Sequence, residues 1–339
     1  MIRLSPFPSP SPSPSPSRAA RRRVLPPGVL AAALALVLLP APGPARAAEN
    51  AEWSVYPVAS VPGGRPYFHL AAAPGTTAGD RVTLTNKTAA PLTFRLYAAD
   101  AYNTERDGGF AVRAVTERQR GIGAWARPAR ERVTVPARGS VTVPYTLTVP
   151  EDAEPGDHAG ALVALDERIS RSGGPVDIGV RRAVGARIHL RVEGPAVPAL
   201  SVEDLRLAHH RPLLPGTGDS TAVISYTLHN RGNVTLNPRV ELAAEGLFGR
   251  DLLARRLTAV PAELLPRQKV RLTERWRGAP HTEWGEVRLT ATAQGVRESA
   301  GVSYVALPWV AALVLAVLGG GAGVWLRVRR RAGHAGDTA

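Results

Sequence analysis

The chain has 339 residues, with 42 lysines and arginines, 28 aspartates and glutamates, and no cysteine. Without cysteine, a disulfide scaffold, a thiol nucleophile and a Cys-ligated metal site are excluded. The length allows about two domains at roughly 150 residues each. With 33 glycines, 31 prolines and 5% aromatic residues, the composition favours short strands and turns over long helices.

The net charge of +14 is concentrated at the two ends of the chain. Residues 1–47 contain six arginines and no acidic residue, and residues 305–339 contain four arginines and one aspartate. The two ends therefore carry 9 of the 14 net positive charges. Because a nucleic-acid-binding protein concentrates its positive charge on a folded patch, we expect no nucleic-acid partner.

Residues 1–47 have the organisation of a secretory signal peptide. A Ser-Pro-rich start leads into Arg21–Arg23 and then into an 11-residue apolar run, Val29–Leu39. That run is too short for a bilayer, which needs about 20 residues. A basic region, a short apolar region and the A-x-A sequence ending at Ala47 together define a cleavable signal peptide. We expect cleavage between Ala47 and Ala48; an uncleaved anchor is the alternative.

A second apolar run lies near the C-terminus. Val305–Trp325 is 21 residues without a charge, which is long enough to cross a bilayer. We therefore predict a transmembrane helix at 305–326 and a basic tail at 327–339. The tail contains Arg327, Arg329, Arg330 and Arg331. The positive-inside rule places these arginines in the cytoplasm, which predicts a single-pass cell-membrane protein with an extracellular ectodomain.

Between these ends the dominant pattern is an alternation of apolar and polar residues. It runs through Val82–Thr85, Val141–Val149, Arg187–Val192, Ala222–His229 and Val287–Thr292. Alternation of this kind predicts half-buried antiparallel strands. One short helix is expected within Ala114–Ala126. We predict an all-β protein of two tandem Ig-like β-sandwich domains, at 48–193 and 199–304, joined by a linker at 194–198.

No motif of known chemistry stands out in these domains. The chain has no GxSxG, HExxH or phosphate-binding loop. Two acidic clusters invite a calcium or paired-carboxylate interpretation, but both surround turn sequences, and turns are the expected role. The clusters are Asp100, Asn103, Glu105 and Asp107, and Glu151, Asp152, Glu154 and Asp157. We predict a non-enzyme with no catalytic residue, no metal site and no cofactor.

Aromatic residues are the candidate ligand contacts. Surface aromatics on a sandwich are a common platform for glycan or protein binding. The alternative is that these side chains fill the core. The candidates are Trp53, Tyr56, Tyr67, Phe68 and Trp125.

Several motifs in the first predicted domain resemble a known family. They are Phe68-His69-Leu70, Pro74-Gly75, Val82–Asn86, Trp125, Val133–Pro136, Val141–Val149, Pro155-Gly156 and Ala159-Gly160-Ala161. Together they resemble DUF916, the peptidoglycan-binding domain of WxL-interacting proteins, over about Trp53–Val192. The resemblance implies a surface protein that binds peptidoglycan or another wall polymer, and partner surface proteins. It names no catalytic residue. The second domain matches no usual partner domain of that family.

The predicted function is thus a membrane-anchored, non-catalytic surface protein whose outer domain binds the cell wall or partner surface proteins. Many membrane-held copies would make weak single contacts sufficient. The alternative is an adhesion or assembly module that binds a protein partner by strand addition along a sheet edge. A wall-modifying enzyme and a purely structural spacer are the remaining alternatives.

Overall fold

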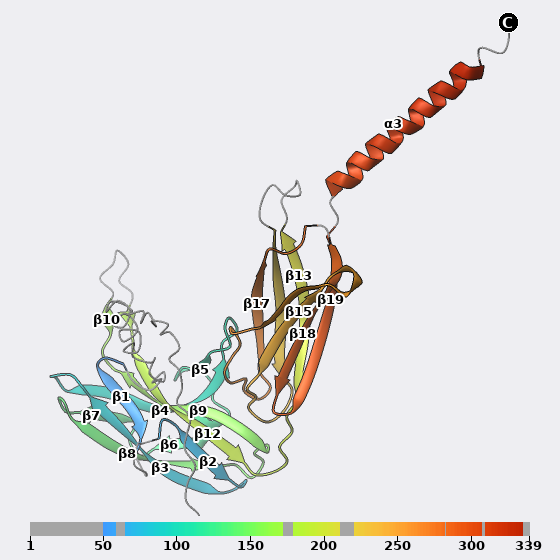
Figure 1. Ribbon diagram of the computed structural model, residues 1–339. Helices are drawn as coiled ribbons and strands as arrows, with labels where there is room; N and C mark the ends of the chain where they lie inside the picture. The colour runs from blue at the N-terminus through green and yellow to red at the C-terminus, as the bar shows by residue number, and fades with distance from the viewer. Residues whose placement is uncertain are drawn as a thin grey trace, which may run out of the picture. The chain divides into compact units, whose positions relative to one another are not determined.

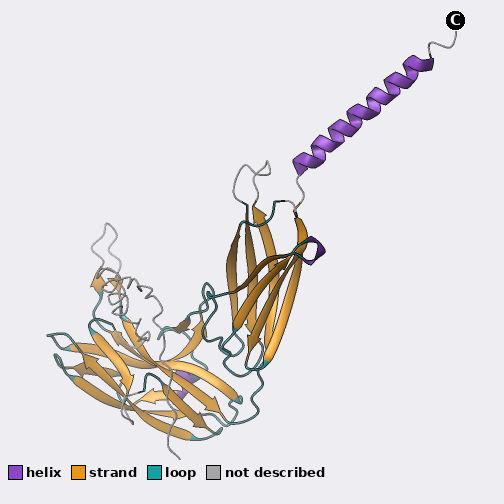
Figure 2. Cartoon of the chain, viewed as in Figure 1, coloured by secondary structure: helices purple, strands orange, loops and turns teal. Residues whose placement is uncertain are grey.

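The computed structural model describes residues 50–58, 65–171, 179–210, 220–281, 283–306 and 309–334 (Figure 1). The predicted signal peptide and its cleavage site at Ala47 and Ala48 lie outside the described residues. Strands dominate the described chain, and its one long helix lies near the C-terminus (Figure 2). The predicted all-β class and the Ig-like β-sandwich architecture are confirmed in this form. Residues 46–339 form one compact unit.

The first sandwich has a four-stranded and a six-stranded sheet. The four-stranded sheet has the order β1-β3-β8-β6, with β1 at Trp53–Pro57, β3 at Thr77–Asn86, β8 at Ser140–Thr148 and β6 at Ala126–Pro128. The other has the order β2-β12-β9-β4-β5, with β7 also on β4. Its strands are β2 (Phe68–Ala72), β12 (Ala183–Val192), β9 (Gly156–Asp166), β4 (Leu92–Asn103), β5 (Phe110–Val112) and β7 (Arg132–Val135). All pairs are antiparallel except β12 with β2.

The alternation seen in the sequence becomes the inner and outer faces of these sheets. In β8, Val143, Tyr145 and Leu147 are buried while the residues between them are exposed. The helix expected within 114–126 is the single turn α2, at Ile122–Trp125. A small ribbon pairs β10, at Ser170–Arg171, with β11, at Gly179–Val180.

The second sandwich has a three-stranded and a four-stranded sheet. The first has the order β13-β14-β17, with β13 at Leu200–His210, β14 at Thr221–Asn230 and β17 at Lys269–Arg277. The second has the order β16-β15-β18-β19, with β16 at Asp251–Arg256, β15 at Arg239–Glu245, β18 at Glu283–Ala293 and β19 at Val296–Ala306. A 3₁₀ turn, η2, covers Leu247–Gly249. Each sandwich encloses its own hydrophobic cluster.

The C-terminal segment differs from the sequence prediction. Val305 and Ala306 pair with Trp284 and Glu283 in the β18–β19 ladder, so strand pairing takes the first two residues of the predicted 305–326 span. Helix α3 runs from Trp309 to His334 and includes the backbone of the four tail arginines. In the part of the chain that the structure describes, no helix is long and apolar enough to cross a membrane. The predicted span is therefore not supported.

Candidate functional site

Two of the five aromatic candidates fill the core. Trp53 and Phe68 are 0% exposed. The Trp53 ring lies 5.3 Å from that of Phe94, and the Phe68 ring lies 5.1 Å from that of Tyr145. Their predicted role as surface contacts is corrected, because a fully enclosed ring has no face left for a ligand.

The other three candidates, Tyr56, Tyr67 and Trp125, are half-buried, and each makes different contacts. Tyr56 is in β1, on the four-stranded sheet, whereas Tyr67 directly precedes β2 on the six-stranded sheet. The Tyr67 ring lies 5.7 Å from that of His189. The Trp125 ring lies 4.7 Å from that of His158 and packs against the first core. The structure therefore does not gather the five into one platform.

The two sandwiches are joined by specific backbone contacts in the turn before β9. The Asp157 amide donates to the Asn233 carbonyl at 2.7 Å, and the Thr235 amide donates to the Asp157 carboxylate at 2.7 Å. Gly156 has a φ of +122°, and a Cβ added there would lie 2.2 Å from the Asn233 carbonyl oxygen. The acidic cluster at 151–157 therefore serves the turn and the junction, and only glycine fits at the point of closest approach.

The acidic cluster at the β4–β5 hairpin, residues 100–107, provides a further set of contacts between the two sandwiches. Asn103 is 4% exposed, and its amide donates to the carbonyls of Gly108 and Glu263. Its side-chain oxygen accepts from the Leu265 amide at 2.8 Å. Asp107 binds Thr104 and the Gly109 amide within the turn. Turn formation, as expected, accounts for these polar groups.

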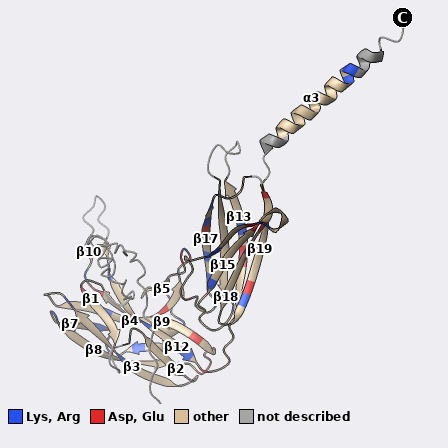
Figure 3. Cartoon of the chain, in the orientation of Figure 1, with Lys and Arg blue, Asp and Glu red and all other residues tan. Residues whose placement is uncertain are grey.

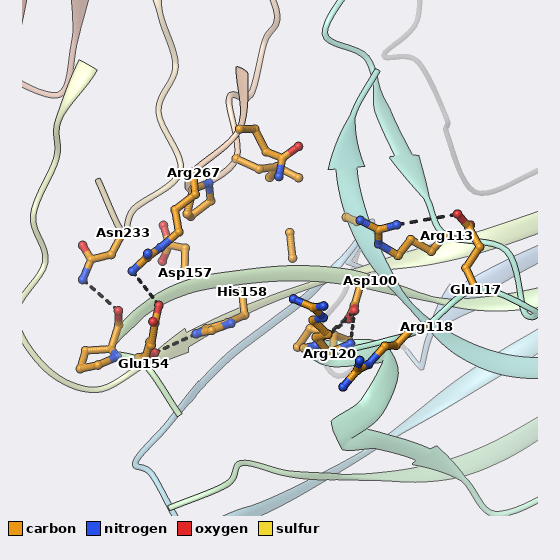
Figure 4. Close-up of a pocket in the computed structure, with 18 residues that line it drawn as sticks. Asp100, Arg113, Glu117, Arg118, Arg120, Glu154, Asp157, His158, Asn233 and Arg267 are labelled. Atoms are coloured by element: carbon orange, nitrogen blue, oxygen red, sulfur yellow. Dashed lines mark hydrogen bonds and ion pairs between the residues drawn. The ribbon is translucent and has the colours of Figure 1, made fainter. Parts of the chain in front are cut away.

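An open groove of about 630 Å³ lies beside these contacts (Figure 4). It is lined by the end of β4, the segment from Arg113 to Ile122, the turn from Glu154 to Ala159, Asn233, and residues 265–268. Asp100 organises its floor, since its carboxylate accepts the amides of Gly121 and Gly123 at 3.1 and 2.7 Å. These bonds hold the chain that enters α2.

The carboxylates of the groove are matched by partners, and two arginines are not. Glu117 pairs with Arg113 at 3.7 Å, and Glu154 pairs with Arg267 at 2.7 Å. Asp157 pairs with Arg191 on β12. Arg118 and Arg120 are exposed and line the groove, and neither forms an ion pair with any carboxylate of the described ranges. The groove is lined by four arginines and four carboxylates, so its formal charge is balanced, with Arg118 and Arg120 as its exposed cations outside an ion pair of the described residues.

A second cavity of about 780 Å³ borders the parallel pair β2–β12. His69 and His189 are register partners there, and their rings stack at 5.2 Å. Burial holds the pKa of His189 below its ordinary value, and the nearby charges of His69 and Arg187 act in the same direction while that of Glu263 opposes them. The lowered pKa favours the neutral imidazole of His189. Within the described ranges, no cluster of three or more His, Asp or Glu side chains could hold a metal ion.

The second sandwich contains a strand whose outer edge is open. β17 is nine residues long and pairs with β14 along its whole length. On its other side, no strand of the described chain forms a ladder with it. Free N–H and C=O groups on such an edge are a template for another strand.

Two hydrogen bonds show which residues present their backbone at this edge. The Gln268 carbonyl accepts from the Asn230 amide, so even-numbered positions point to β14. The Arg275 carbonyl lies on the opposite side, where the Arg255 guanidinium of β16 donates to it at 2.8 Å. Because successive peptide groups point to opposite sides of a strand, Lys269, Arg271 and Thr273 also present their backbone groups at the open edge.

The side chains of β17 also alternate, between the core and the outer face of the sheet. Val270, Leu272 and Trp276 are 0–5% exposed in the core. The odd-numbered side chains are exposed on the outer face: Lys269, Arg271, Thr273, Arg275 and Arg277. Among the charged ones, Lys269 binds Glu203 at 3.0 Å. Hydrogen bonds from His229 and Lys269 lower the pKa of Glu203 to about 2, so the Glu203 carboxylate stays ionised at neutral pH.

Sequence reasoning missed this edge. The alternation of basic and apolar residues from Lys269 to Arg277 is visible in the sequence and predicts a strand. It carries no signal for which strands lie at the edge of a sheet, since that depends on the pairing of segments far apart in the chain.

No family model and no curated protein matches this chain. Its structure is similar to a chain of the chaperone–tip adhesin complex of CFA/I fimbriae, at 12% identity and a TM-score of 0.35, covering 76% of this chain and 100% of that chain. It is also similar to a chain of the Salmonella enterica SafA pilin–SafB chaperone complex, at 12% identity and a TM-score of 0.33, covering 76% and 98%. Such values define neither a family nor a function. The resemblance to DUF916 stays a prediction.

Proposed function

We propose that this protein is a non-catalytic binding module that captures an extended segment of a protein partner by strand addition at β17. The observation that carries the proposal is the nine-residue strand with one ladder and one open edge. Backbone hydrogen bonds would supply affinity, and side chains at alternate positions would supply specificity.

The placement of β17 supports the proposal. The inner side chains of β17, including Trp276, are packed in the second core. The backbone of β17 is therefore fixed in position before a partner binds. The Trp276 ring packs edge-on against that of Tyr304 at 6.1 Å. A preorganised strand loses little conformational freedom on binding, which favours affinity.

The test uses a proline that blocks the edge without breaking the fold. Thr273 presents its N–H at the open edge, so Thr273→Pro removes an outer donor and leaves the β14 ladder intact. Thr273→Ala keeps the N–H and is the matched control. Full-length wild type and both variants would be used to capture partners from an envelope extract of the source organism.

We expect the same partner with wild type and Thr273→Ala, and its loss with Thr273→Pro. Amide exchange at residues 271 and 273 should slow when the partner is bound. Equal capture by Thr273→Pro, with no added protection of these amides, would show that the edge is not the binding site.

A second candidate function is wall binding by the first sandwich. It is supported by the DUF916 resemblance and by the unpaired Arg118 and Arg120 in the groove, which suit an anionic polymer. The test is co-sedimentation of the full-length protein with purified peptidoglycan at low and high salt. The double variant Arg118→Gln/Arg120→Gln should reduce pelleting, whereas Arg297→Gln on β19 should not. Equal pelleting of all three would exclude this groove.

The single-pass location with the ectodomain outside is likewise our proposal, from the sequence alone. N-terminal sequencing of the protein from the cell envelope should begin at Ala48. Deletion of residues 309–334, which leaves β19 whole, should move the protein from the membrane fraction to the medium. If the deletion leaves the distribution unchanged, the predicted anchor is wrong.

A further inference from the structure

The open edge of β17 carries a row of positive charge that the fold itself does not use. Arg271, Arg275 and Arg277 are exposed on the outer face of the strand. Their side chains form no ion pair with any carboxylate in the part of the chain that the structure describes. Figure 3 marks basic positions on β17. At about 3.3 Å per residue, the row from Arg271 to Arg277 is roughly 20 Å long.

Lys269, the next cation in the row, differs from these three. It is bound to Glu203, which also accepts from His229 on the neighbouring strand. The first position of β17 is thus electrically balanced by β13, and the free charge begins at Arg271. The fold provides partners for one end of the strand and leaves the other end without them.

We infer that the partner segment received by β17 is acidic, with carboxylates at alternate positions opposite Arg271, Arg275 and Arg277. This inference rests on the proposed strand addition. A strand added to an edge places each side chain directly opposite its counterpart on the same face, with Cβ atoms about 4.5–5.5 Å apart. Opposite charges at such pairs stabilise the sheet, and like charges destabilise it.

The register gives the pattern of the segment. For an antiparallel strand, residues from the N-terminal end face Arg277, then Arg275, then Thr273, then Arg271, with one residue between each. The matching segment is Glu-x-Glu-x-Thr-x-Glu. The parallel segment has the reverse order, Glu-x-Thr-x-Glu-x-Glu. The intervening residues face the side of the sheet where Leu272 and Trp276 are buried and Glu274 pairs with Arg255. Apolar side chains therefore suit the first and last of the three intervening positions.

A peptide fits this edge better than a polyanion without amides. The residues that carry these guanidinium groups also present backbone N–H and C=O groups at the edge. Of these, the Arg275 carbonyl already accepts from the Arg255 guanidinium, and an added strand would replace that bond. An acidic strand satisfies both sets of groups at once. A phosphate or sugar polymer would neutralise the charge and leave the backbone groups to water.

The experiment measures binding of labelled peptides to the full-length protein by fluorescence anisotropy. The probes are Glu-Val-Glu-Val-Thr-Val-Glu, its reverse, and the matched peptides with glutamine in place of glutamate. We expect a glutamate peptide to bind several-fold more tightly than its glutamine counterpart, with the preference shrinking as salt rises. Arg271→Gln and Arg277→Gln should each weaken binding by about two- to fivefold. Arg297→Gln, which removes an exposed charge from β19, is the matched control and should leave binding unchanged.

The outcomes separate this inference from the proposed function. If glutamate and glutamine peptides bind equally and Thr273→Pro abolishes both, strand addition stands and the acidic preference is wrong. If inorganic polyphosphate displaces the peptides and Thr273→Pro has no effect, the row is a polyanion surface and both proposals fall. If no peptide binds and the arginine variants self-associate, the arginines serve only to keep edges apart, and the inference is overturned.

Discussion

The strands at the edges of the sheets differ in length between the two sandwiches. In the first, the strands at the sheet margins are short: β1 and β2 have five residues each, and β5 and β6 have three each. In the second, the margins are longer: β13 and β19 have eleven residues each, β17 has nine and β16 has six. Short margins are a common defence against unwanted pairing. The longer margins, and the exposed arginines on β17, are the reason we propose the second sandwich as the one that meets another strand.

The first sandwich, in turn, provides the rigid attachment. Its hairpin and its β8–β9 turn hold the second sandwich through Asn103, Gly156 and Asp157. The predictions below test this division of roles, from the largest expected effect to the smallest.

Trp53→Ala should give the largest effect, because Trp53 is fully buried in the first core. Removing a buried Trp costs about 3–5 kcal/mol of unfolding free energy. Chemical denaturation of the full-length protein would measure it. Trp284→Ala is the control, since Trp284 is 58% exposed and should change stability by less than about 0.5 kcal/mol. Equal effects would contradict a core role for Trp53.

Gly156→Ala should disturb the junction itself. A residue with a side chain at this positive φ is strained by about 1–3 kcal/mol, and its Cβ would also collide with the Asn233 carbonyl. Gly295→Ala is the matched control, because Gly295 has a φ of +82° and no atom within 4 Å of the added Cβ. We expect Gly156→Ala to lower the calorimetric Tm more than Gly295→Ala. A smaller effect would mean that the turn before β9 relaxes away from Asn233.

Asn103→Ala should weaken the contacts between the two sandwiches without changing either hydrophobic core. It leaves the Glu263 carbonyl and the Leu265 amide without their side-chain partner, at about 1–3 kcal/mol. We expect calorimetry to resolve two unfolding transitions where the wild type shows one. Asn86→Ala removes a buried Asn that bonds only within the first sandwich, and it should lower stability without separating the transitions. Separation in both variants would show that Asn103 has no special role.

Mild acid should give the smallest effect. Because the pKa of His189 is lowered in the folded protein, the unfolded chain takes up the proton first as pH falls below about 6.5. The contribution of His189 to the free energy of unfolding is fully present above that pH, and it is lost as the pH falls toward the pKa of the folded state. Urea denaturation between pH 7.5 and 5 should show this decline, and His189→Asn should flatten it. An unchanged decline in the variant would assign it to other groups.

Sequence reasoning succeeded where the signal was local. The alternation in Val141–Val149 and Ala222–His229 predicted β8 and β14, because the period of two along a half-buried strand is written in neighbouring residues. Turn residues such as Pro155-Gly156 were recognised for the same reason. The roles of Trp53 and Tyr67 were not separable, since an aromatic side chain suits both a core and a surface platform.

The sequence by itself determined the all-β class, the positions of several strands and the two-sandwich division, because periodicity and turn chemistry are properties of short segments. Tertiary structure decided which side of each strand is paired. It joined Asn103 to Leu265 and Asp157 to Thr235 across long stretches of chain. It also left β17 at a margin, with three arginines that form no ion pair among the residues that the structure describes. Pairing between distant segments depends on the whole packed core, so no local sequence pattern could predict it.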